Sequence, residues 1–579
     1  MKPVSDKFAI AAALQEIGVL LELKGGEYFK ARAYKSGARA VAELSEDIGT
    51  LIRQKRLTFV KGIGYALAKQ IEELYTGGPS SLLNELRADL PSGIVELSQI
   101  PGLSVKKVAA LHDALAITSV EQLKAAAEAG KVRQVKGFGA KSEQQLLAAI
   151  AGHNNQERHI HLHHALRTGE RILEYLGTAP GGSRAELAGS LRRRQETVSQ
   201  IIIVASAKSP KKLIDHILRF PLVVRVEEQT AQYCTVVLNE GFKATLFAVK
   251  PEEFPAVLLQ ATGSEAHLRK LQQVAARKKL KLSELGVEEQ GTSKSKKAIR
   301  VKSEADIYAR LGMQYVTPEL REDHGEVEAA MAERLPEDLI ITDDIRGMVH
   351  CHTTYSDGKH SVEQMVQAAE SMGMKYITIT DHSPTAFYAG GVKIDRLQKQ
   401  WEEIDRVQEQ AKIKILKGTE SDILKDGALD YPDWVLEQFD VIVASIHSRY
   451  KMNEDQMTQR IVTAMRQPLF KIWGHALGRR IQERPPFDCR VEEILDVIAE
   501  SRAAVEINGD PYRLDMEPRW LREARKRKIK FVVSVDAHSM GALNNVKFGV
   551  DMARRAWIRR GEVLNTLGVK AFQKAVRPV

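Results

Sequence analysis

The sequence has 579 residues, 44% of them hydrophobic and 28% charged, with 85 lysines and arginines against 75 aspartates and glutamates. One hydrophobic core does not extend over so long a chain, so we expect about four domains. Three cysteines without paired spacing exclude a disulfide framework, and no apolar run reaches the ~18 residues that a membrane span requires. These features predict a cytoplasmic protein, and the net charge of +10 favours a polyanionic partner.

The first part of the chain is expected to be helical, because apolar residues recur at helical spacing in 11–23 and 105–115. Short glycine turns interrupt this pattern at 60–64, 100–104 and 135–139. Such turns let backbone N–H groups at the start of the next helix approach a DNA phosphate without reading a base. Ordinary glycine-capped helix turns are the alternative. The glycines expected to contact DNA are Gly62, Gly64, Gly102, Gly137 and Gly139.

A further helix is expected at 157–176, and its first turns are rich in histidine. No additional ligand spacing supports a metal site there, so these histidines are interpreted as solvated helix residues. Farther along, 284–302 has Gly, Ser and Lys in excess and is predicted to be a flexible basic loop. The histidines concerned are His159, His161, His163 and His164.

From residue 347 onward, short apolar segments alternate with helical periodicities, which predicts a parallel sheet or barrel. In the first segment, GMVHCHTTYSDG, a period of two places His350 and His352 on one face and Cys351, as a buried hydrophobe, on the other. The carboxyl ends of such strands meet at one rim, where we expect a metal centre. The later segments close on Asp381 with His382, Glu420, His447, His475, Asn508, and Asp536 with His538.

The stretches GMVHCHTTYSDG, ITDHS, KGTESDIL, ASIHSRY, WGHALGRR and SVDAHS resemble, in order, the motifs of the PHP (polymerase and histidinol phosphatase) superfamily. The version fused to bacterial family X DNA polymerases is the most similar. The resemblance implies a centre of three divalent metal ions, and mixed nitrogen and oxygen ligation suits Mn²⁺, Zn²⁺ or Fe²⁺. The implied ligands are His350, His352, Glu420 and Asp536 for the first ion, Glu420 as a bridge with His447 and His475 for the second, and Asp357, His382 and His538 for the third.

Catalysis at this centre is expected to need carboxylates and a histidine that activate water, and arginines that hold phosphate. For each arginine, a surface role without catalysis is the alternative. Two further arginines beside strand-end motifs, Arg479 and Arg480, are also candidates. The residues expected to act in catalysis are Glu420, Asp536, His350, Arg449 and Arg513.

The glycine turns, together with GGEYFKARAYKSGARAV at 25–41, resemble the N-terminal and fingers regions of family X polymerases. The segment 188–204 resembles their palm, where Ser190 and Arg193 match the triphosphate side. Neutral residues replace the three aspartates that would hold two metal ions, so polymerisation is expected to be absent. Gln70 stands where some members carry a Schiff-base lysine, so lyase activity is not carried over. The replacing residues are Gln200, Ile202 and Thr245.

The expected fold is multidomain. It comprises an all-α helix-hairpin-helix N-terminal region, an α+β nucleotidyltransferase-like palm and thumb, and a C-terminal α/β distorted (βα)7 PHP barrel. The expected domains are an N-terminal helix-hairpin-helix DNA-binding domain at 1–90, a fingers-like domain at 91–155, a degenerate palm at 156–248, a thumb-like domain at 249–331 and the PHP domain at 340–579.

The leading functional hypothesis is a metal-dependent DNA phosphodiesterase in DNA repair. It would act as a 3′–5′ exonuclease or process 3′ ends or abasic sites, with the polymerase part retained for sequence-independent DNA binding through phosphates, in the nucleoid. A PHP phosphatase acting on a small phosphomonoester is the main alternative. An active or residual polymerase and a non-catalytic DNA-binding scaffold are further alternatives.

Overall fold

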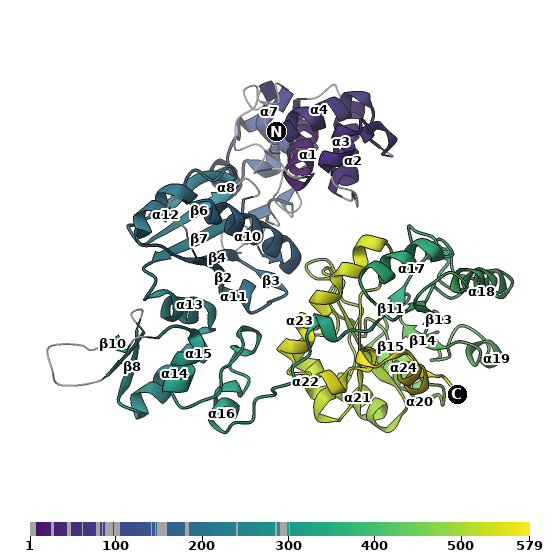
Figure 1. Ribbon diagram of the computed structural model, residues 1–579. Helices are drawn as coiled ribbons and strands as arrows, with labels where there is room; N and C mark the ends of the chain where they lie inside the picture. Colours follow the sequence, from purple (N-terminus) through teal and green to yellow (C-terminus); the bar gives the residue numbers. More distant parts are fainter. Residues whose placement is uncertain are drawn as a thin grey trace. The chain divides into compact units, whose positions relative to one another are not determined.

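The computed structural model spans the chain, which divides into two compact units, Met1–Arg158 and His159–Val579 (Figure 1). Within the described residues, no helix combines the length and apolar character needed to cross a bilayer. The boundaries expected for five domains stay a prediction. The structure describes all residues except 1–6, 25–27, 43, 45–47, 61, 77–81, 84, 87–96, 98–102, 104, 141, 145, 148–158, 180–183, 239–240, 284–285, 290–297 and 300.

The first unit is built from helices, as expected. Its longest pair is α1 (Lys7–Lys24) packed along α2 (Tyr28–Ala42). In α1 the buried residues Ile10, Leu14 and Ile17 recur every three or four positions, which is the spacing of one helix face. The shorter helices described in this unit are α3 (Ile48–Arg53), α4 (Tyr65–Thr76), α7 (Val105–Leu115) and α8 (Val120–Glu128).

The second unit begins with a five-stranded sheet in the order β2-β4-β7-β6-β5. Neighbours β4 and β7 are parallel, and their register places Ile202 opposite Thr245. Helices α10 (Leu162–Gly177) and α12 (Pro210–Ile217) pack against the sheet. The strands are β2 (Arg184–Ala188), β4 (Gln200–Ser206), β5 (Val223–Gln229), β6 (Tyr233–Leu238) and β7 (Lys243–Val249).

The helix predicted at 157–176 begins later than expected. A short strand, β1 (Ile160–His161), precedes α10 and pairs antiparallel with β3 (Thr197–Val198). The strand forms by pairing with β3, which lies 36 or more residues away in the sequence. Local periodicity does not register a pairing over that separation. The prediction that His161 is helical was therefore wrong.

The prediction that the histidines of this region are solvated was wrong for His161, His163 and His164, which are partly buried, whereas His159 is exposed. The rings of His163 and His164 lie 3.9 Å apart between centroids, and the ring of Tyr512 lies 5.0 Å from that of His163. Burial, with smaller effects from His164, His161 and Arg167, lowers the pKa of His163 to about 2. His163 and His164 are therefore neutral packing groups at neutral pH.

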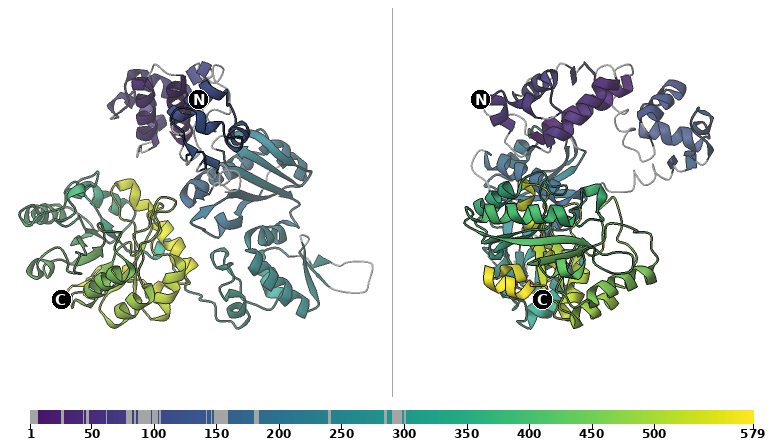
Figure 2. Two further views of the ribbon diagram at one scale, coloured as in Figure 1. Left: turned by 180° about the vertical axis from the view of Figure 1, so that it is seen from behind. Right: turned by 90° about the vertical axis from the view of Figure 1, so that its right-hand side faces the viewer.

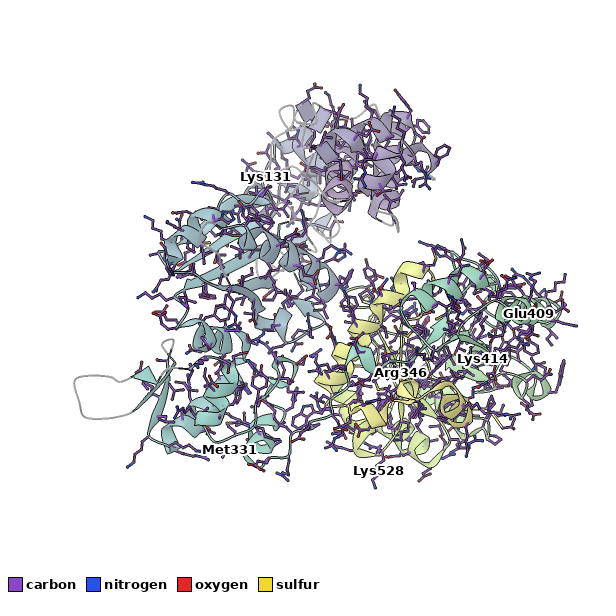
Figure 3. All side chains as sticks on the ribbon, viewed as in Figure 1. Lys131, Met331, Arg346, Glu409, Lys414 and Lys528 are labelled. Atoms are coloured by element: carbon purple, nitrogen blue, oxygen red, sulfur yellow. The ribbon has the colours of Figure 1, made fainter. Side chains whose placement is uncertain are left out.

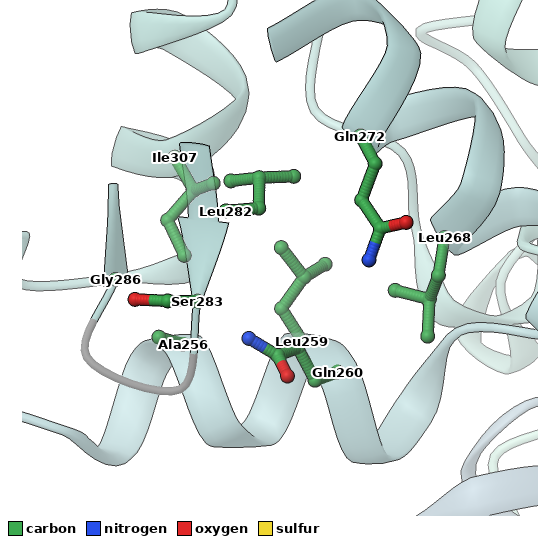
Figure 4. A pocket seen from close by; sticks show the side chains of 9 residues that line it. All are labelled: Ala256, Leu259, Gln260, Leu268, Gln272, Leu282, Ser283, Gly286 and Ile307. Carbon is green, nitrogen blue, oxygen red and sulfur yellow. The ribbon is translucent and has the colours of Figure 1, made fainter. Parts of the chain in front are cut away.

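A helical domain with a small three-stranded sheet follows, with strand order β10-β9-β8. Strands β9 and β10 lie inside 284–302, so the described part of that segment is not the loop that was predicted. A cavity of about 40 Å³ is lined by Leu259, Gln260 and Ile307, together with Ser283 at the end of β8 and Gly286 at the start of β9 (Figure 4). The elements are α13 (Phe254–Thr262), α14 (Glu265–Arg277), β8 (Leu280–Ser283), β9 (Gly286–Glu289), β10 (Ala298–Ile299), α15 (Glu304–Arg310) and α16 (Glu326–Met331).

A buried ion network ties this domain to the five-stranded sheet. Arg321, whose side chain is fully buried, donates to Glu304 Oε1 at 2.5 Å. Arg192 reaches the other oxygen of Glu304 at 2.7 Å. The carboxylate is shared between two guanidinium groups, which compensates its removal from water.

The C-terminal part is a parallel barrel, seen from two further sides in Figure 2. Its strands follow one another in sequence order from β11 to β17. Backbone bonds from His352 N to Ala537 O (2.9 Å) and from Ala537 N to His350 O (3.0 Å) join the first strand to the last and close the ring. The strands are β11 (Gly347–Cys351), β12 (Tyr376–Ile379), β13 (Lys414–Asp422), β14 (Val441–Ser445), β15 (Ile472–Trp473), β16 (Ala504–Asn508) and β17 (Phe531–Ser534).

Helices lie between successive strands of the barrel, as the alternating pattern predicted. Side chains from both fill its apolar layers, in which Trp473 and Phe531 are fully buried. The helices are α17 (Val362–Ser371), α18 (Ile394–Gln408), α19 (Asp433–Leu436), α20 (Glu454–Arg466), α21 (Val491–Glu500), α22 (Pro518–Lys526), α23 (Val546–Arg555) and α24 (Val569–Val576).

We predict that Glu304→Gln destabilises the domain around α15, because it leaves the buried guanidinium of Arg321 without its carboxylate. Removing one member of a buried ion pair costs about 3 to 5 kcal/mol. Differential scanning calorimetry should show a lower unfolding temperature for one transition. The control is Glu265→Gln, since that carboxylate is 88% exposed and lies 3.9 Å from Arg269. Equal shifts in the two variants would contradict the role of the network.

Candidate metal centre

The predicted donor side chains gather at one end of the barrel. Arg346 and Lys414, labelled in Figure 3, mark the amino-terminal starts of β11 and β13. The donors come from the other ends, because all seven strands run in the same direction. The residues brought together there are His350, His352, Asp357, His382, Glu420, His447, His475, Asp536 and His538.

The first donor group surrounds two carboxylates. His350 Nε2 lies 3.2 Å from Glu420 Oε1 and 3.4 Å from Asp536 Oδ1. His352 Nε2 lies 3.1 Å from the same Asp536 oxygen. The ligand atoms of these four residues all lie within 4.8 Å of one another, close enough to share one cation.

The second group shares Glu420 with the first. His447 Nε2 and His475 Nε2 lie 3.2 Å and 2.8 Å from Glu420 Oε1. On the other oxygen, Oε2, His382 Nδ1 approaches to 2.8 Å. One carboxylate therefore has donors of both groups around it, which is the arrangement that a bridging ligand requires.

The third group lies at the open side of the centre. His538 Nε2 is 3.1 Å from Asp357 Oδ1, and His382 Nε2 is 3.6 Å from the same oxygen. His352 Nδ1 approaches that oxygen to 3.9 Å. His382 thus faces Asp357 with one ring nitrogen and Glu420 with the other, so it borders two donor groups.

Unpartnered polar atoms test whether the site suits metal ions. Several buried donor atoms have no hydrogen-bond partner, although burying a polar atom without one is costly. Coordination to cations would satisfy these atoms, and neutral imidazoles with carboxylates form a ligand set typical of Mn²⁺, Zn²⁺ and Fe²⁺. The atoms are His350 Nε2, His352 Nε2, His382 Nδ1, Glu420 Oε2 and Asp536 Oδ1.

Two buried carboxylates orient the donor histidines from behind. Glu506 Oε1 lies 2.6 Å from His350 Nδ1, and Asp422 hydrogen-bonds His447 Nδ1. Each bond leaves the Nε2 atom of the ring facing Glu420. Asn508, at the end of β16, was the residue predicted from this strand, whereas Glu506 was not predicted, although a carboxylate within the apolar segment 503–507 was an available signal.

The backbone is strained at several donor positions. His350, His475 and Asp536 have positive φ angles of 66°, 23° and 50°. Residues other than glycine adopt such angles rarely, and they cluster at functional sites. The pairing of β11 with β12 also shifts register between Met348 and Cys351, so a regular period of two does not describe this strand. The two imidazoles are neighbours nonetheless, with centroids 5.2 Å apart, and Cys351 is buried.

Charges of opposite sign hold the centre together. Burial alone would raise the pKa of Glu420, but His447, His350 and His382 hold that pKa well below its usual value. Burial would likewise lower the pKa of His447, yet Glu420 and Asp422 raise it to about 10. Burial and the neighbouring His538 lower the pKa of His352 to about 4. The carboxylates are therefore ionised and available as ligands at neutral pH.

The candidate arginines differ in their surroundings. Arg513 Nε lies 3.5 Å from Asp536 Oδ2, and its Nε and Nη1 atoms make no hydrogen bond. Arg449 is exposed and has a positive φ. Arg479 instead pairs with Glu196 of the segment before the five-stranded sheet's β4, at 3.0 Å. Arg480 pairs with Glu483 at 2.7 Å. Of these arginines, Arg513 borders the donor cluster.

The palm-like positions form a neutral, packed site. Thr245 Oγ1 donates to Gln200 Oε1 at 3.1 Å and lies 3.0 Å from Thr235 Oγ1. A methyl group on Gly189 would come within 2.9 Å of Ile202 Cδ1, so the isoleucine side chain fills the space beside that turn.

The predicted triphosphate-side arginine also has other partners. Arg193 Nε donates to Glu322 at 2.6 Å, and its Nη1 donates to the Thr262 carbonyl at 2.7 Å. Ser190 lies in α11 (Gly189–Arg192), one turn before it. The carboxylate of Glu322 thus supplies the negative charge that pairs with the Arg193 guanidinium.

Two of the predicted glycine turns are described, while Gly102 lies outside the described residues. Gly62 and Gly137 have φ angles of 92° and 95°, which favour glycine. Around Gly64 and Gly139 there is open space for 4 Å beyond an added Cβ. Each turn therefore presents accessible backbone at the start of the next helix.

Comparisons with protein families match four segments of the chain. The DNA polymerase beta thumb family matches residues 257–322, and the PHP domain family matches 349–510. A helix-hairpin-helix domain family matches 5–79, and a SAM-like helix-hairpin-helix tandem matches 94–151.

Individual proteins and a solved structure are also similar to parts or all of this chain. The DNA polymerase/3′-5′ exonuclease PolX of Bacillus subtilis strain 168 is 34% identical over 564 residues, covering 97% of each chain. A probable phosphatase of Thermoanaerobacter sp. strain X514 is 27% identical over 234 residues, covering 38% of this chain and 89% of that protein. A crystal structure of Leishmania infantum polymerase beta in a ternary complex is 19% identical, covers 40% of this chain and 97% of its own, and has a TM-score of 0.28.

Helix-hairpin-helix domains, a polymerase thumb and a seven-stranded parallel barrel in one chain define a family X polymerase architecture joined to a PHP domain. The chain belongs to the bacterial PolX family. The expected family and fold class are confirmed. PHP domains depend on metal ions, and the clustered donors described here could bind them.

We predict that Glu506→Gln weakens Mn²⁺ binding by about 10- to 100-fold, because the amide holds the His350 ring less firmly than a carboxylate. Isothermal titration of chelator-treated protein measures this directly, without an activity assay. The control is Glu500→Gln, since Glu500 is exposed on α21. Unchanged affinity in Glu506→Gln would show that the carboxylate does not orient a ligand.

Proposed function

We propose that the barrel hydrolyses DNA phosphodiester bonds from the 3′ end. The observation that carries this proposal is the shared position of Glu420 among the donor groups, since adjacent cations suit phosphoryl transfer. The PolX relative is named a 3′-5′ exonuclease over a match that covers 97% of both chains. A role in DNA repair, in 3′-end or abasic-site processing, belongs to the same proposal.

The proposed ligands are the predicted ones, grouped around Glu420, Asp536 and Asp357. Divalent ions held there, in the proposal three of Mn²⁺, Zn²⁺ or Fe²⁺, would supply Lewis-acid activation of water and neutralise phosphoryl oxygens. His350 and Glu420 are proposed ligands of the first ion, and Asp536 lies between these residues and Arg513.

The chain's own groups then place the substrate. Arg513 is the guanidinium best placed to donate to a phosphoryl oxygen, with Arg449 as a second candidate at the rim. In the reaction a water oxygen attacks phosphorus, and the bond to the 3′ oxygen of the preceding nucleotide breaks. That oxygen takes up a proton, and a 5′-mononucleotide leaves. The products are a shortened strand and a free nucleotide.

DNA binding is proposed for the helix-hairpin-helix turns. Accessible backbone at Gly62, Gly64, Gly137 and Gly139 supports contacts to phosphates rather than bases. The net charge of +10 adds a sequence-independent, salt-dependent attraction. Gly102 is assigned the same role from the sequence alone.

Polymerase activity is proposed to be absent. Neither the amide of Gln200, the side chain of Ile202 nor the hydroxyl of Thr245 offers an anionic oxygen to Mg²⁺. Their contacts to one another and to neighbouring neutral groups support this interpretation. The polymerase-like part would then serve to hold DNA.

The alternative function is hydrolysis of a small phosphomonoester. The probable phosphatase of Thermoanaerobacter, which matches over 38% of this chain, favours it. Turnover of p-nitrophenyl phosphate in preference to a labelled primer-template, both with Mn²⁺, would support this alternative over the nuclease.

We predict that His350→Ala abolishes cleavage of 5′-labelled single-stranded, gapped and abasic DNA. The variant removes a proposed ligand of the first metal ion and leaves the helix-hairpin-helix turns unchanged. Fluorescence anisotropy should therefore show nearly unchanged DNA affinity. The control is His324→Ala, a half-exposed histidine of the thumb-like domain. Persistent cleavage by His350→Ala would exclude the barrel centre as the catalyst.

We predict no templated primer extension by the purified chain with any deoxynucleotide or divalent metal, because the palm-like site lacks carboxylate ligands. The measurement is gel analysis of a labelled primer-template. His350→Ala serves as the assay background, since it should not degrade the primer. Template-directed extension would overturn the interpretation of Gln200, Ile202 and Thr245.

A further inference from the structure

Two aromatic side chains stand exposed on one short turn of the barrel. Phe387 and Tyr388 are 80% and 70% exposed, and both belong to η5 (Phe387–Ala389). The turn follows β12 and lies five residues after the donor His382. Large aromatic side chains are normally buried, so an exposed pair beside a polar centre calls for a partner with an aromatic or apolar face.

The turn borders the metal centre. The ring centroid of Tyr388 lies 6.2 Å from that of His382 and 6.4 Å from that of His447. Tyr388 is an uncharged aromatic side chain. A group lying against this ring is therefore next to the proposed catalytic donors and meets no additional charge.

Hydrogen bonds anchor both ends of the turn. Val392 N donates to the His382 carbonyl at 2.8 Å, and Gly391 N donates to the Ala386 carbonyl at 3.1 Å. A Cβ at Gly391 would come within 2.1 Å of the Ser383 carbonyl oxygen, so the chain passes too close there for any side chain. The turn is therefore fixed to the segment after β12 that carries His382.

A second support joins the turn to the neighbouring loop. Arg396 donates through Nη1 to the Gly390 carbonyl at 3.3 Å and through Nη2 to the Thr354 carbonyl at 3.4 Å. Its guanidinium also lies 5.5 Å from the centroid of the Tyr355 ring. The loop after β11 and the turn after β12 are thus held together, and the exposed rings sit on a fixed base.

We propose that Phe387 and Tyr388 form a stacking platform for the base of the 3′-terminal nucleotide. This inference rests on the proposed nuclease function. In a nucleotide one sugar separates the base from its phosphate, so a phosphate among the donors brings its base to the rim. Bases of every kind have a π face, so stacking tolerates any sequence. Because a stacked base is unpaired, the platform selects single-stranded or frayed 3′ ends.

The test uses the full chain with Mn²⁺ and four variants: Phe387→Ala, Tyr388→Ala, Tyr388→Phe and Trp434→Ala. Trp434 is an exposed aromatic of the same barrel, 59% exposed on α19, and serves as the matched control. Two 5′-labelled single strands are compared, one ending in a normal nucleotide and one ending in a tetrahydrofuran residue without a base. Circular dichroism confirms that each variant is folded.

The expected result is a defect that depends on the terminal base. Loss of one base–aromatic stack should lower the rate on the normal strand by roughly 5- to 100-fold at low substrate, mainly through KM. Phe387→Ala and Tyr388→Ala should show this defect on the normal strand and none on the base-free strand. Tyr388→Phe and Trp434→Ala should resemble the wild type. Equal defects on both strands, or no defect, would overturn the platform.

A binding measurement separates this inference from the nuclease function. A strand ending in 2-aminopurine is titrated with His350→Ala, whose donor site is impaired, and stacking should quench the terminal fluorescence. The quenching should be lost in the double variant that carries both His350→Ala and Phe387→Ala. Quenching without cleavage by the wild type would support the stacking platform and reject the proposed nuclease function. Cleavage without quenching would reject the platform alone.

Discussion

The barrel centre depends on one buried carboxylate. Glu420 is fully enclosed in β13, and its two oxygens face imidazole nitrogens at 2.8 to 3.5 Å from strands on several sides. An isolated carboxylate in such a place would be protonated, whereas this one is ionised because positive and polar groups surround it. The imidazoles belong to His350, His352, His382, His447 and His475.

The barrel meets this requirement by placing support behind the donors. Glu506 accepts from Ser534 and Asn508 as well as facing His350, so its own charge is compensated within the strand layer. His350, near the end of β11, and Asp536, just beyond the end of β17, have positive φ angles. Such angles cost about 1 to 3 kcal/mol each and persist only where the surroundings impose them. The packing of the strands thus imposes the strained backbone angles at the site.

Local sequence patterns predicted the barrel because each strand is apolar and each ends on a donor. They also predicted the family. They did not predict Glu506 as a support, because its hydrogen bond to His350 joins residues more than 150 positions apart in the sequence. The burial of His163 was missed for the same reason, since its neighbour Tyr512 lies on another part of the chain. Hydrophobic periodicity and composition reflect local structure. They do not reveal contacts between residues that lie far apart in the sequence.

The packing around the palm-like site has a consequence for protein engineering. A lone aspartate in place of Thr245 would meet the Thr235 hydroxyl and the Gln200 amide, with no cation to pair with. One in place of Ile202 would leave a void beside Gly189. Each single acidic substitution would introduce an uncompensated charge or a cavity, because two carboxylates are needed to bind the ions. A metal-binding pair of carboxylates at this site would therefore have to be installed together.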